Sequence, residues 1–348
     1  MIETLHELGA PEPVLSLSKD LDFETGESTK LNTTTANTES VSIRVLRTVA
    51  ELRAWSRDAR RPVSLPDDAG CGTVSWAGPP GTVGLVPTMG ALHEGHASLI
   101  RAASASCGAV AVSIFVNPTQ FGPNEDFARY PRTFDADCAL AQAAGADVIF
   151  APHVEEIYPA GAATFIDVEG LSDRLDGKSR PGHFRGVATV VAKLFIAAEP
   201  DQAFFGQKDA AQVAVLRRMT ADLRLATEIV VCPIVREADG LALSSRNIYL
   251  SEEEREWALT LIRAVRQAEA LYACGERRAV RILHAVRMTF AEMPQIRVDY
   301  VALVDWETLE PVEIAKPGSL FAVAAWVGAT RLIDNATLGL AVSPGDPL

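Results

Sequence analysis

Between Thr82 and Val235, five short apolar runs alternate with stretches of helical composition, and this alternation constrains the fold more than any other feature. The runs are rich in β-branched residues and phenylalanine: TVGLVPT, AVAVSIFV, DVIFAP, QAFFG and TEIVVCPIV. Nearly continuous apolar strands are typical of parallel sheets covered on both faces. The pattern therefore predicts a doubly wound α/β domain, with helices at 97–106, 133–144, 187–198 and 209–223.

The N-terminal flank has a different composition. Residues 1–42 contain the polar run TKLNTTTANTES, which has almost nothing to bury, and we interpret this segment as a disordered extension. It is followed by a short strand, SIRVL, and by a helix, VAELRAWSRDA, for which Thr48 and Glu51 form a capping box. Residues 62–81 are rich in proline and glycine and should form a loop.

The C-terminal flank reads as helices followed by strands. Ser251 and Glu254 form a second capping box at the start of a long helix, and a further helix is expected at 278–293. The stretches VDYVALV and SLFAVAAWV resemble strands. We therefore expect a smaller α+β domain that closes over the site, and three parts in all: the extension at 1–42, the α/β domain at 43–235 and the α+β domain at 236–348.

Composition limits the classes of function. The chain carries 45 acidic and 32 basic residues, a net charge of −13, which argues against a nucleic-acid-binding surface. No apolar run is long enough to span a membrane, and the N-terminus lacks the pattern of a secretory signal. The five cysteines are scattered without a CxxC pair, so we expect reduced thiols. These features are typical of a cytoplasmic protein that acts on small molecules.

A strand-to-helix turn at 87–96, PTMGALHEGH, is the first candidate for chemistry. Such turns lie at the carboxyl edge of a parallel sheet, where α/β proteins bind ligands, and the helix N-terminus favours phosphate. His93 and His96 should face the same way and can donate hydrogen bonds to phosphate oxygens. The spacing is not the HExxH of a zinc protease, and the chain has neither a P-loop nor GxGxxG. Taken alone, the residues fit either phosphate chemistry or two structural histidines.

Two later segments supply cations and hydroxyls. After QAFFG, Lys208 and Asp209 should lie in the first turn of a helix, where Lys208 suits phosphate. Asp209 either caps that helix or binds a ribose hydroxyl. The serines and arginine at 244–246 suit an oxyanion clamp on a mobile flap, although a polar loop with a solvated arginine is the more common meaning of such a stretch.

Neutral amides lie between these motifs. Asn117 and Gln120 follow the run AVAVSIFV and can hydrogen-bond a polar, uncharged group, and Gln212 lies one turn after Lys208. Arg180 comes just before a helix, where it either neutralises an anion or marks an exposed helix start.

Together and in this order, eight blocks resemble pantothenate synthetases, the pantoate–β-alanine ligases: VPTMGALHEGH, VSIFVNPTQFG, YPRTFDAD, SRPGHFRGVATVVAKL, FFGQKD, READGLALSSRN, VDYVALVD and TRLIDN. This family has a Rossmann-like domain of the HIGH-type nucleotidyltransferases, with HEGH in place of HIGH and SSR resembling the KMSKS loop. The resemblance implies that pantoate attacks Mg-ATP to give pantoyl adenylate and pyrophosphate. The amine of β-alanine then attacks the adenylate and releases AMP. It also implies a homodimer.

The resemblance further implies roles for single residues. Catalytic roles fall to His93, His96, Lys208 and Arg246. The implied ATP site comprises Pro87, Met89, His93, His96, Gly206, Lys208, Asp209, Val235, Ser244, Ser245 and Arg246. The implied pantoate site comprises Gln120, Gln212, Asn117 and Arg180. The ligands of the Mg²⁺ ion are not identified. Gln207 and Ala211 stand where many relatives have Glu and Gln, but neither carries an assigned role.

Two other functions are weighed against this one. Another HxGH nucleotidylyltransferase would act on a phosphorylated acceptor, which needs more Arg and Lys than the neutral amides here supply. A catalytically silent nucleotide-binding relative should lack one of the four catalytic residues, and all four are present.

Overall fold

The structure is a computed structural model, and it describes residues 42–61, 78–123, 125 and 127–340. The extension expected at 1–42 lies outside these residues except for Ser42, and most of the loop expected at 62–81 also lies outside them. Within the described part of the chain, the four cysteines are free thiols. No helix in that part is long and apolar enough to cross a membrane.

Six parallel strands form the larger sheet, in the order β1-β4-β3-β2-β5-β6. Their bounds are β1 Arg44–Leu46, β2 Val83–Thr88, β3 Ala109–Ile114, β4 Val148–Phe150, β5 Gln202–Gly206 and β6 Glu228–Cys232. The predicted doubly wound fold is confirmed. The chain runs outward from β2 to β3 and β4 and then crosses to β5 on the other side of β2. The direction of the strand order therefore reverses between β2 and β5.

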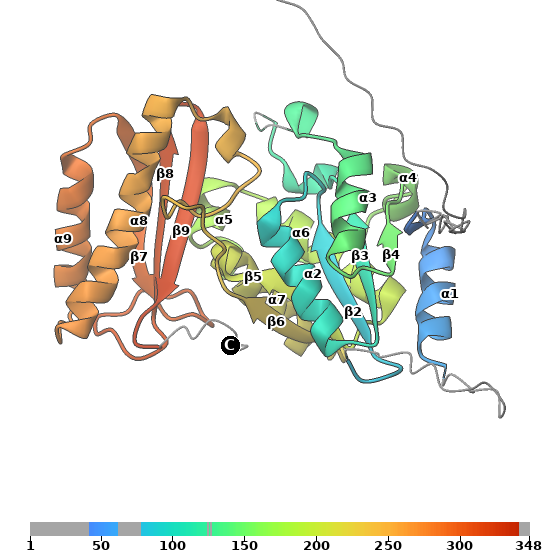
Figure 1. The fold of residues 1–348 in the computed structure, drawn as a ribbon. Coiled ribbons are helices and arrows are strands. Elements are labelled where there is room, and N and C mark those ends of the chain that lie inside the picture. The colour runs from blue at the N-terminus through green and yellow to red at the C-terminus, as the bar shows by residue number, and fades with distance from the viewer. Residues whose placement is uncertain (1–41, 62–77, 124, 126, 341–348) are drawn as a thin grey trace, which may run out of the picture. The chain divides into compact units, whose positions relative to one another are not determined.

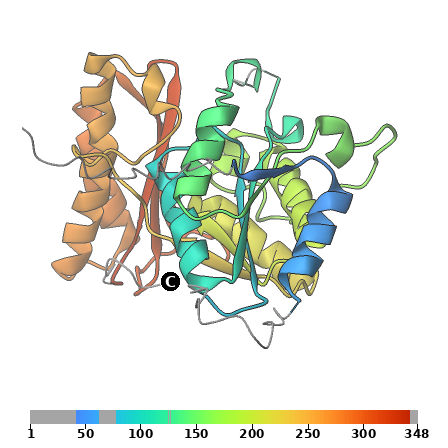
Figure 2. The same ribbon diagram turned by 45° about the vertical axis from the view of Figure 1, so that its right-hand side comes forward.

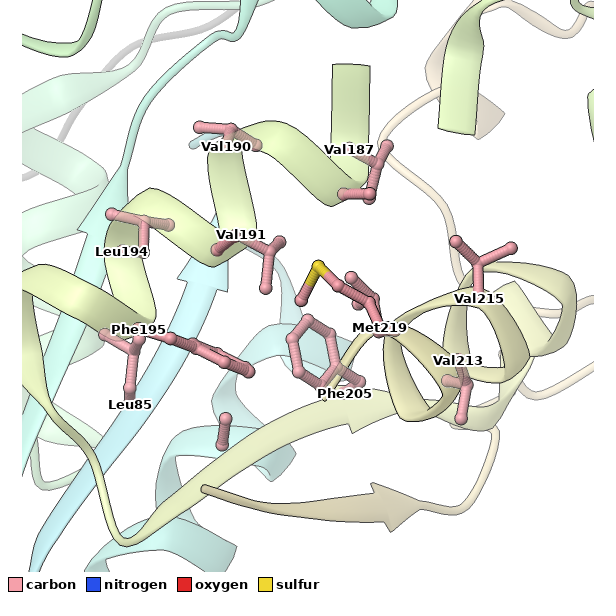
Figure 3. Packing of buried hydrophobic residues seen from close by; sticks show 14 of the residues in the cluster. Leu85, Val187, Val190, Val191, Leu194, Phe195, Phe205, Val213, Val215 and Met219 are labelled. Atoms are coloured by element: carbon pink, nitrogen blue, oxygen red, sulfur yellow. The ribbon is translucent and has the colours of Figure 1, made fainter. Parts of the chain in front are cut away.

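Helices cover both faces of this sheet (Figures 1 and 2). One face carries α2 (Glu94–Ser106) and α3 (Phe134–Ala143), and the other carries α1 (Val49–Ala59), α6 (His183–Ala198) and α7 (Ala210–Asp222). Valines and Leu194 of α6 pack with Leu85 of β2, Phe205 of β5 and Met219 of α7 (Figure 3). The short helices α4 (Val154–Ile157) and α5 (Asp176–Ser179) lie in the connection to α6.

Helix starts are where the sequence prediction succeeds and fails most clearly. The capping box of α1 forms as predicted, because the Glu51 N–H donates to Thr48 Oγ1 at 3.2 Å and the Thr48 N–H donates to Glu51 Oε2 at 2.9 Å. By contrast, α2 and α6 begin at Glu94 and His183, earlier than the predicted 97 and 187. The first turn of α2 is Glu-Gly-His-Ala and that of α6 is His-Phe-Arg-Gly, so each interrupts the apolar pattern with Gly, His and a charged residue, and hydrophobic periodicity does not reveal where the helix begins.

A three-stranded antiparallel sheet follows, with the order β7 (Ile296–Val304), β8 (Leu320–Val327) and β9 (Thr330–Thr337). Helices α8 (Glu252–Ala273) and α9 (Ala279–Ala291) cover one of its faces. Along β8, Leu320 and Ala322 belong to the core that contains α6 and α7, whereas Phe321 and Val323 face α8 and α9. Burial on both faces explains the unbroken apolar run of β8. The polar strand β9 was not predicted.

Candidate active site

A cavity of about 230 Å³ lies at the carboxyl ends of β2 and β5, where the strand order reverses. This is the place where open α/β sheets bind ligands. Every residue that the sequence singled out for ATP or pantoate lines this cavity: Pro87, Met89, His93, His96, Asn117, Gln120, Arg180, Gly206, Lys208, Asp209, Gln212, Val235, Ser244, Ser245 and Arg246. Residues from separate segments of the sequence thus converge on one cleft.

His93 and His96 sit at the start of α2 with their ring centroids 4.1 Å apart. His93 is the N-cap residue, and its Nδ1 accepts a hydrogen bond from the Gly95 N–H at 3.1 Å. The Nδ1 atom of His96 accepts from the His93 N–H at 3.2 Å. Gly95 is required here for space, because a Cβ atom would lie 2.9 Å from the His93 ring. The turn therefore brings the two imidazoles together, as predicted.

These hydrogen bonds fix the protonation of both rings. Burial, followed by the charge of Lys208, lowers the pKa of His93 to about 4. Burial, followed by His93 and Lys208, lowers the pKa of His96 to about 3. Both imidazoles are therefore neutral at pH 7. Since each Nδ1 accepts a hydrogen bond, each ring carries its proton on Nε2, and that N–H is the donor left for a ligand.

Asp137 of α3 holds the turn that precedes the histidines. Its carboxylate accepts hydrogen bonds from the Ala91 and Leu92 N–H groups at 3.0 and 2.8 Å, and its side chain is almost completely buried. Gly90 has a φ of +83°, and a Cβ atom there would lie 3.0 Å from the Asp137 carboxylate. Sequence reasoning missed this role, although a buried aspartate inside an otherwise apolar helix face is a recognisable signal.

Asn117 and Gln120 occupy the loop after β3. The Asn117 amide donates to Gln120 Oε1 and to the Gly186 carbonyl, both at 3.1 Å, and its Oδ1 accepts from Tyr158 at 3.0 Å. Both donors of Asn117 are thus used inside the protein, so its contribution is to orient Gln120. Gln120 also donates to Met89 Sδ at 2.9 Å.

Arg180 lines the cleft but is already paired. Its guanidinium makes two hydrogen bonds to Glu125, both at 2.7 Å, and a third to His183 Nε2 at 2.9 Å. An arginine can only donate, so Nε2 of His183 is an acceptor and its Nδ1–H donates to the Gln120 carbonyl at 2.8 Å. Burial, followed by Arg180, lowers the pKa of His183 to about 4. Arg180 is thus engaged within the protein, an arrangement that neither expectation, anion binding or an exposed helix start, described.

Lys208 and Asp209 lie on the other side of the cleft, after β5. They belong to a 3₁₀ turn, Gln207–Asp209, and not to the first turn of α7 as predicted. Among the described residues, no carboxylate lies within ion-pair distance of the Lys208 ammonium. Asp209 is the N-cap residue of α7, yet its exposed side chain makes no capping hydrogen bond. Gly206 has open space in front of its Cα atom. These three residues can therefore meet a ligand directly.

The segment 235–247 is tied internally. The Leu243 N–H donates to the Val235 carbonyl at 2.9 Å, and the Asn247 amide donates to Glu237 at 2.6 Å. The Arg246 N–H donates to Ser244 Oγ at 3.3 Å, and the Arg246 guanidinium lies 5.9 Å from the centre of the Tyr130 ring. The predicted grouping of two hydroxyls and a guanidinium at the cleft is present.

Comparison with known proteins identifies the family. The family model described as "Pantoate-beta-alanine ligase" matches residues 44–337. The chain belongs to this family. The pantothenate synthetase of Acidobacterium capsulatum is 61% identical over 84% of this chain and 96% of its own length. That of Thermotoga neapolitana is 50% identical over 85% of this chain and its whole length. The predicted membership and ligase class are confirmed.

Solved structures agree with this assignment. The pantothenate synthetase of Thermus thermophilus has a TM-score of 0.75 at 45% identity, covering 85% of this chain and 99% of its own. The pantoate–β-alanine ligase of Francisella tularensis, solved in complex with beta-gamma ATP and beta-alanine, has a TM-score of 0.65 at 31% identity. The match covers 86% of this chain and all of the Francisella chain. These likenesses confirm the predicted fold class.

Proposed function

We propose that the cleft joins pantoate to β-alanine at the expense of ATP, giving pantothenate, AMP and pyrophosphate through a pantoyl-adenylate intermediate. Family membership supports the overall reaction. The observation that carries the mechanism is the pair of neutral imidazoles facing Lys208 across the point where the strand order reverses. Such a cleft offers hydrogen-bond donors and the cations Lys208 and Arg246 to a polyphosphate, and we assign the attack on it to the carboxylate of the substrate.

In the first step, the pantoate carboxylate attacks the α-phosphorus of ATP and pyrophosphate leaves. We assign the Nε2–H groups of His93 and His96 to the phosphate oxygens, on which negative charge increases during attack. Lys208, Ser244, Ser245 and Arg246 bind the remaining phosphates. The carboxylate needs no general base, so the protein contributes mainly position and charge.

The nucleoside and pantoate occupy neighbouring parts of the cleft. We place the ribose against Gly206 and Asp209 and the base along Pro87, Met89 and Val235. Pantoate then lies between Gln120 and Gln212, whose neutral amides suit its hydroxyl groups. Asn117 donates a hydrogen bond to the Gln120 side chain and Arg180 donates one to the Gln120 carbonyl, so both residues hold Gln120 in place. In the second step, the β-alanine amine attacks the pantoyl carbonyl and AMP leaves.

We propose that magnesium enters with ATP. Among the described residues, no three His, Cys, Asp or Glu side chains are placed to hold a metal ion together. Of the described residues that line the cleft, Asp209 is the one carboxylate. This donor set fits Mg²⁺ that is held mainly by phosphates and water, which is its usual mode with nucleotides. The ion would neutralise part of the phosphate charge.

We also propose that the protein works in the cytoplasm as a homodimer, with an α/β domain at 43–235 and a C-terminal domain at 236–348 that closes over the cleft. Sedimentation of the purified protein at several concentrations tests the dimer, because a species of about 37 kDa at every concentration would contradict it.

Exchange of labelled pyrophosphate into ATP, with pantoate present and β-alanine absent, tests the first half-reaction. We expect exchange that depends on pantoate and that falls about 100-fold or more in His93→Ala or Lys208→Ala, to a residual rate that single-turnover measurements resolve, while circular dichroism shows an intact fold. Exchange without pantoate, or none from folded protein that binds ATP, would favour another nucleotidylyltransferase or a silent binder. Near wild-type exchange in either variant would contradict the residue roles.

A further inference from the structure

Side chains of the polar strand β9, in the small sheet, contact segments that follow strands of the larger sheet. Figure 1 shows β9 at the edge of the three-stranded sheet that lies towards β5. Three of its side chains contact three separate segments. Arg331 pairs with Asp176 of α5 at 2.7 Å, and Asp334 makes two hydrogen bonds to Arg236 at 2.7 and 2.9 Å. The third side chain is Asn335, which contacts the turn that carries Lys208.

The Asn335 amide is fully engaged with that turn. Its Nδ2 donates to the Lys208 carbonyl at 2.9 Å and to the Gln207 carbonyl at 3.0 Å. Its Oδ1 accepts from the Gln207 side chain at 3.2 Å. Both side chains are buried, at 3% and 4% exposure. An unpaired polar group would be costly in this position, so the amide and the turn hold each other in one arrangement.

The contact bears directly on Lys208, because Lys208 lies in the 3₁₀ turn that precedes α7. The Gln207 and Lys208 carbonyls of this turn accept hydrogen bonds from Asn335 of β9. The backbone of Lys208 is thus fixed by a residue 127 positions later in the sequence. Asp334 restrains the other ATP-side segment at Arg236, and its Oδ1 also accepts from the Asn335 N–H at 2.8 Å. The orientation of Asn335 is therefore itself determined.

We propose that Asn335 is a positioning residue that aligns Lys208 with the phosphates of ATP. The proposal rests on the proposed function for the identity of the reaction, but the alignment of Lys208 concerns any polyphosphate bound in the cleft. A displacement of about 1 Å at a group that acts on the transition state can cost about 100-fold in rate.

A double-mutant cycle separates positioning from mere stability. Pantoyl-adenylate formation is measured in single turnover for the wild type, Asn335→Ala, Lys208→Ala and the double variant. We expect Asn335→Ala to slow the wild type about 10-fold to 100-fold and to slow Lys208→Ala less than about twofold. The same slowing factor in both backgrounds, or no slowing of the wild type, would overturn the proposal.

Two further variants test whether the rate falls only because the fold is less stable. Val323→Ala removes a fully buried methyl pair from β8 without touching the cleft, and should lower the melting temperature while leaving the rate of the folded protein unchanged. Asn335→Ser keeps one donor; it takes the place of Asn335→Ala in the cycle if the alanine variant does not fold, and should fall between that variant and the wild type. An equal rate loss in Val323→Ala would overturn the proposal.

Titration of the same four cycle proteins with Mg-ATP keeps this inference separate from the proposed function. A wild type that forms no adenylate would contradict the function alone. In that case the cycle is read from ATP affinity, where Asn335→Ala should weaken binding in the wild-type background and not in Lys208→Ala. Equal weakening in both backgrounds would overturn the positioning role of Asn335 whatever the reaction.

Discussion

Each ring nitrogen of His93 and His96 has a separate task. The Nδ1 atoms accept backbone hydrogen bonds and so shape the start of α2, while the Nε2–H groups remain for the ligand. An alanine at either position removes both tasks at once. The sequence was sufficient to predict that these histidines share a face, but not that their pKa values are lowered, because that depends on burial and on Lys208, which lies more than a hundred residues away.

Replacing one nitrogen at a time should separate stability from activity. His93→Asn places an oxygen where Nδ1 lies and keeps the helix cap, whereas His93→Gln places an amide nitrogen near Nε2 and keeps the donor. We expect pyrophosphate exchange to fall about 100-fold to 1000-fold in His93→Asn, with unfolding free energy within about 0.5 kcal/mol of wild type. His93→Gln should lose about 1 kcal/mol of stability but retain more activity. Urea unfolding and exchange rates check both; a fully active His93→Asn would refute the Nε2 assignment.

Acid should destabilise the protein through His96. Burial, His93 and Lys208 lower the pKa of folded His96 to about 3, below the value of about 6.5 expected in the unfolded chain. Between these values the unfolded state binds more protons than the folded state. The contribution of neutral His96 to the free energy of unfolding is therefore fully present above about pH 6.5, and it falls as the pH drops, by at most about 1.4 kcal/mol per pH unit. His96→Asn cannot titrate there. Its loss of unfolding free energy between pH 7 and pH 5 should be about 1 to 2 kcal/mol smaller, and equal losses in urea unfolding would contradict the shift.

At the scale of elements, the strands were predictable and the turns between them were not. Strands β2 to β6 follow from continuous apolar runs, because burial on both faces demands them. The 3₁₀ turn at Lys208 and the early start of α6 depend on tertiary contacts. Gly186 of α6 illustrates this. A Cβ atom there would meet the Thr119 carbonyl and lie 2.7 Å from the Gln120 nitrogen, so helix and loop touch backbone to backbone.

Gly186→Ala should therefore damage the pantoate region specifically. The added methyl must push away the turn that carries Gln120, while the ATP side, on β2 and β5, is not touched. We expect the KM for pantoate to rise about 10-fold or more and the KM for ATP to change less than about twofold. Ala192→Gly, buried on the same helix, is the matched control for lost helix stability. Equal shifts of both KM values in Gly186→Ala would show that the contact has no special link to pantoate.

At the scale of the whole molecule, charged pairs join the three-stranded sheet to the remainder. Arg331 of β9 binds Asp176 of α5 and Asp299 of β7, both at 2.7 Å, and the Tyr300 hydroxyl donates to Asp176 at 3.1 Å. Burial opposes the charge of Arg331, but Asp176 and Asp299 more than offset it and raise its pKa above the ordinary value. Periodicity does not reveal such pairs, because the partners are separated by up to 155 positions and each alone resembles a surface charge.

Arg331→Leu should therefore weaken the fold more than its size suggests. It leaves two largely buried carboxylates without their cation, and we expect a loss of about 3 to 5 kcal/mol in unfolding free energy. Adding Asp176→Asn and Asp299→Asn removes the stranded charges, so the triple variant should recover at least half of that loss. Arg297→Ala, which only removes a cation stacked on Trp326, should cost less than about 1 kcal/mol. If the triple variant were no more stable than Arg331→Leu, the loss would come from packing, and the charge network would not be what joins the two sheets.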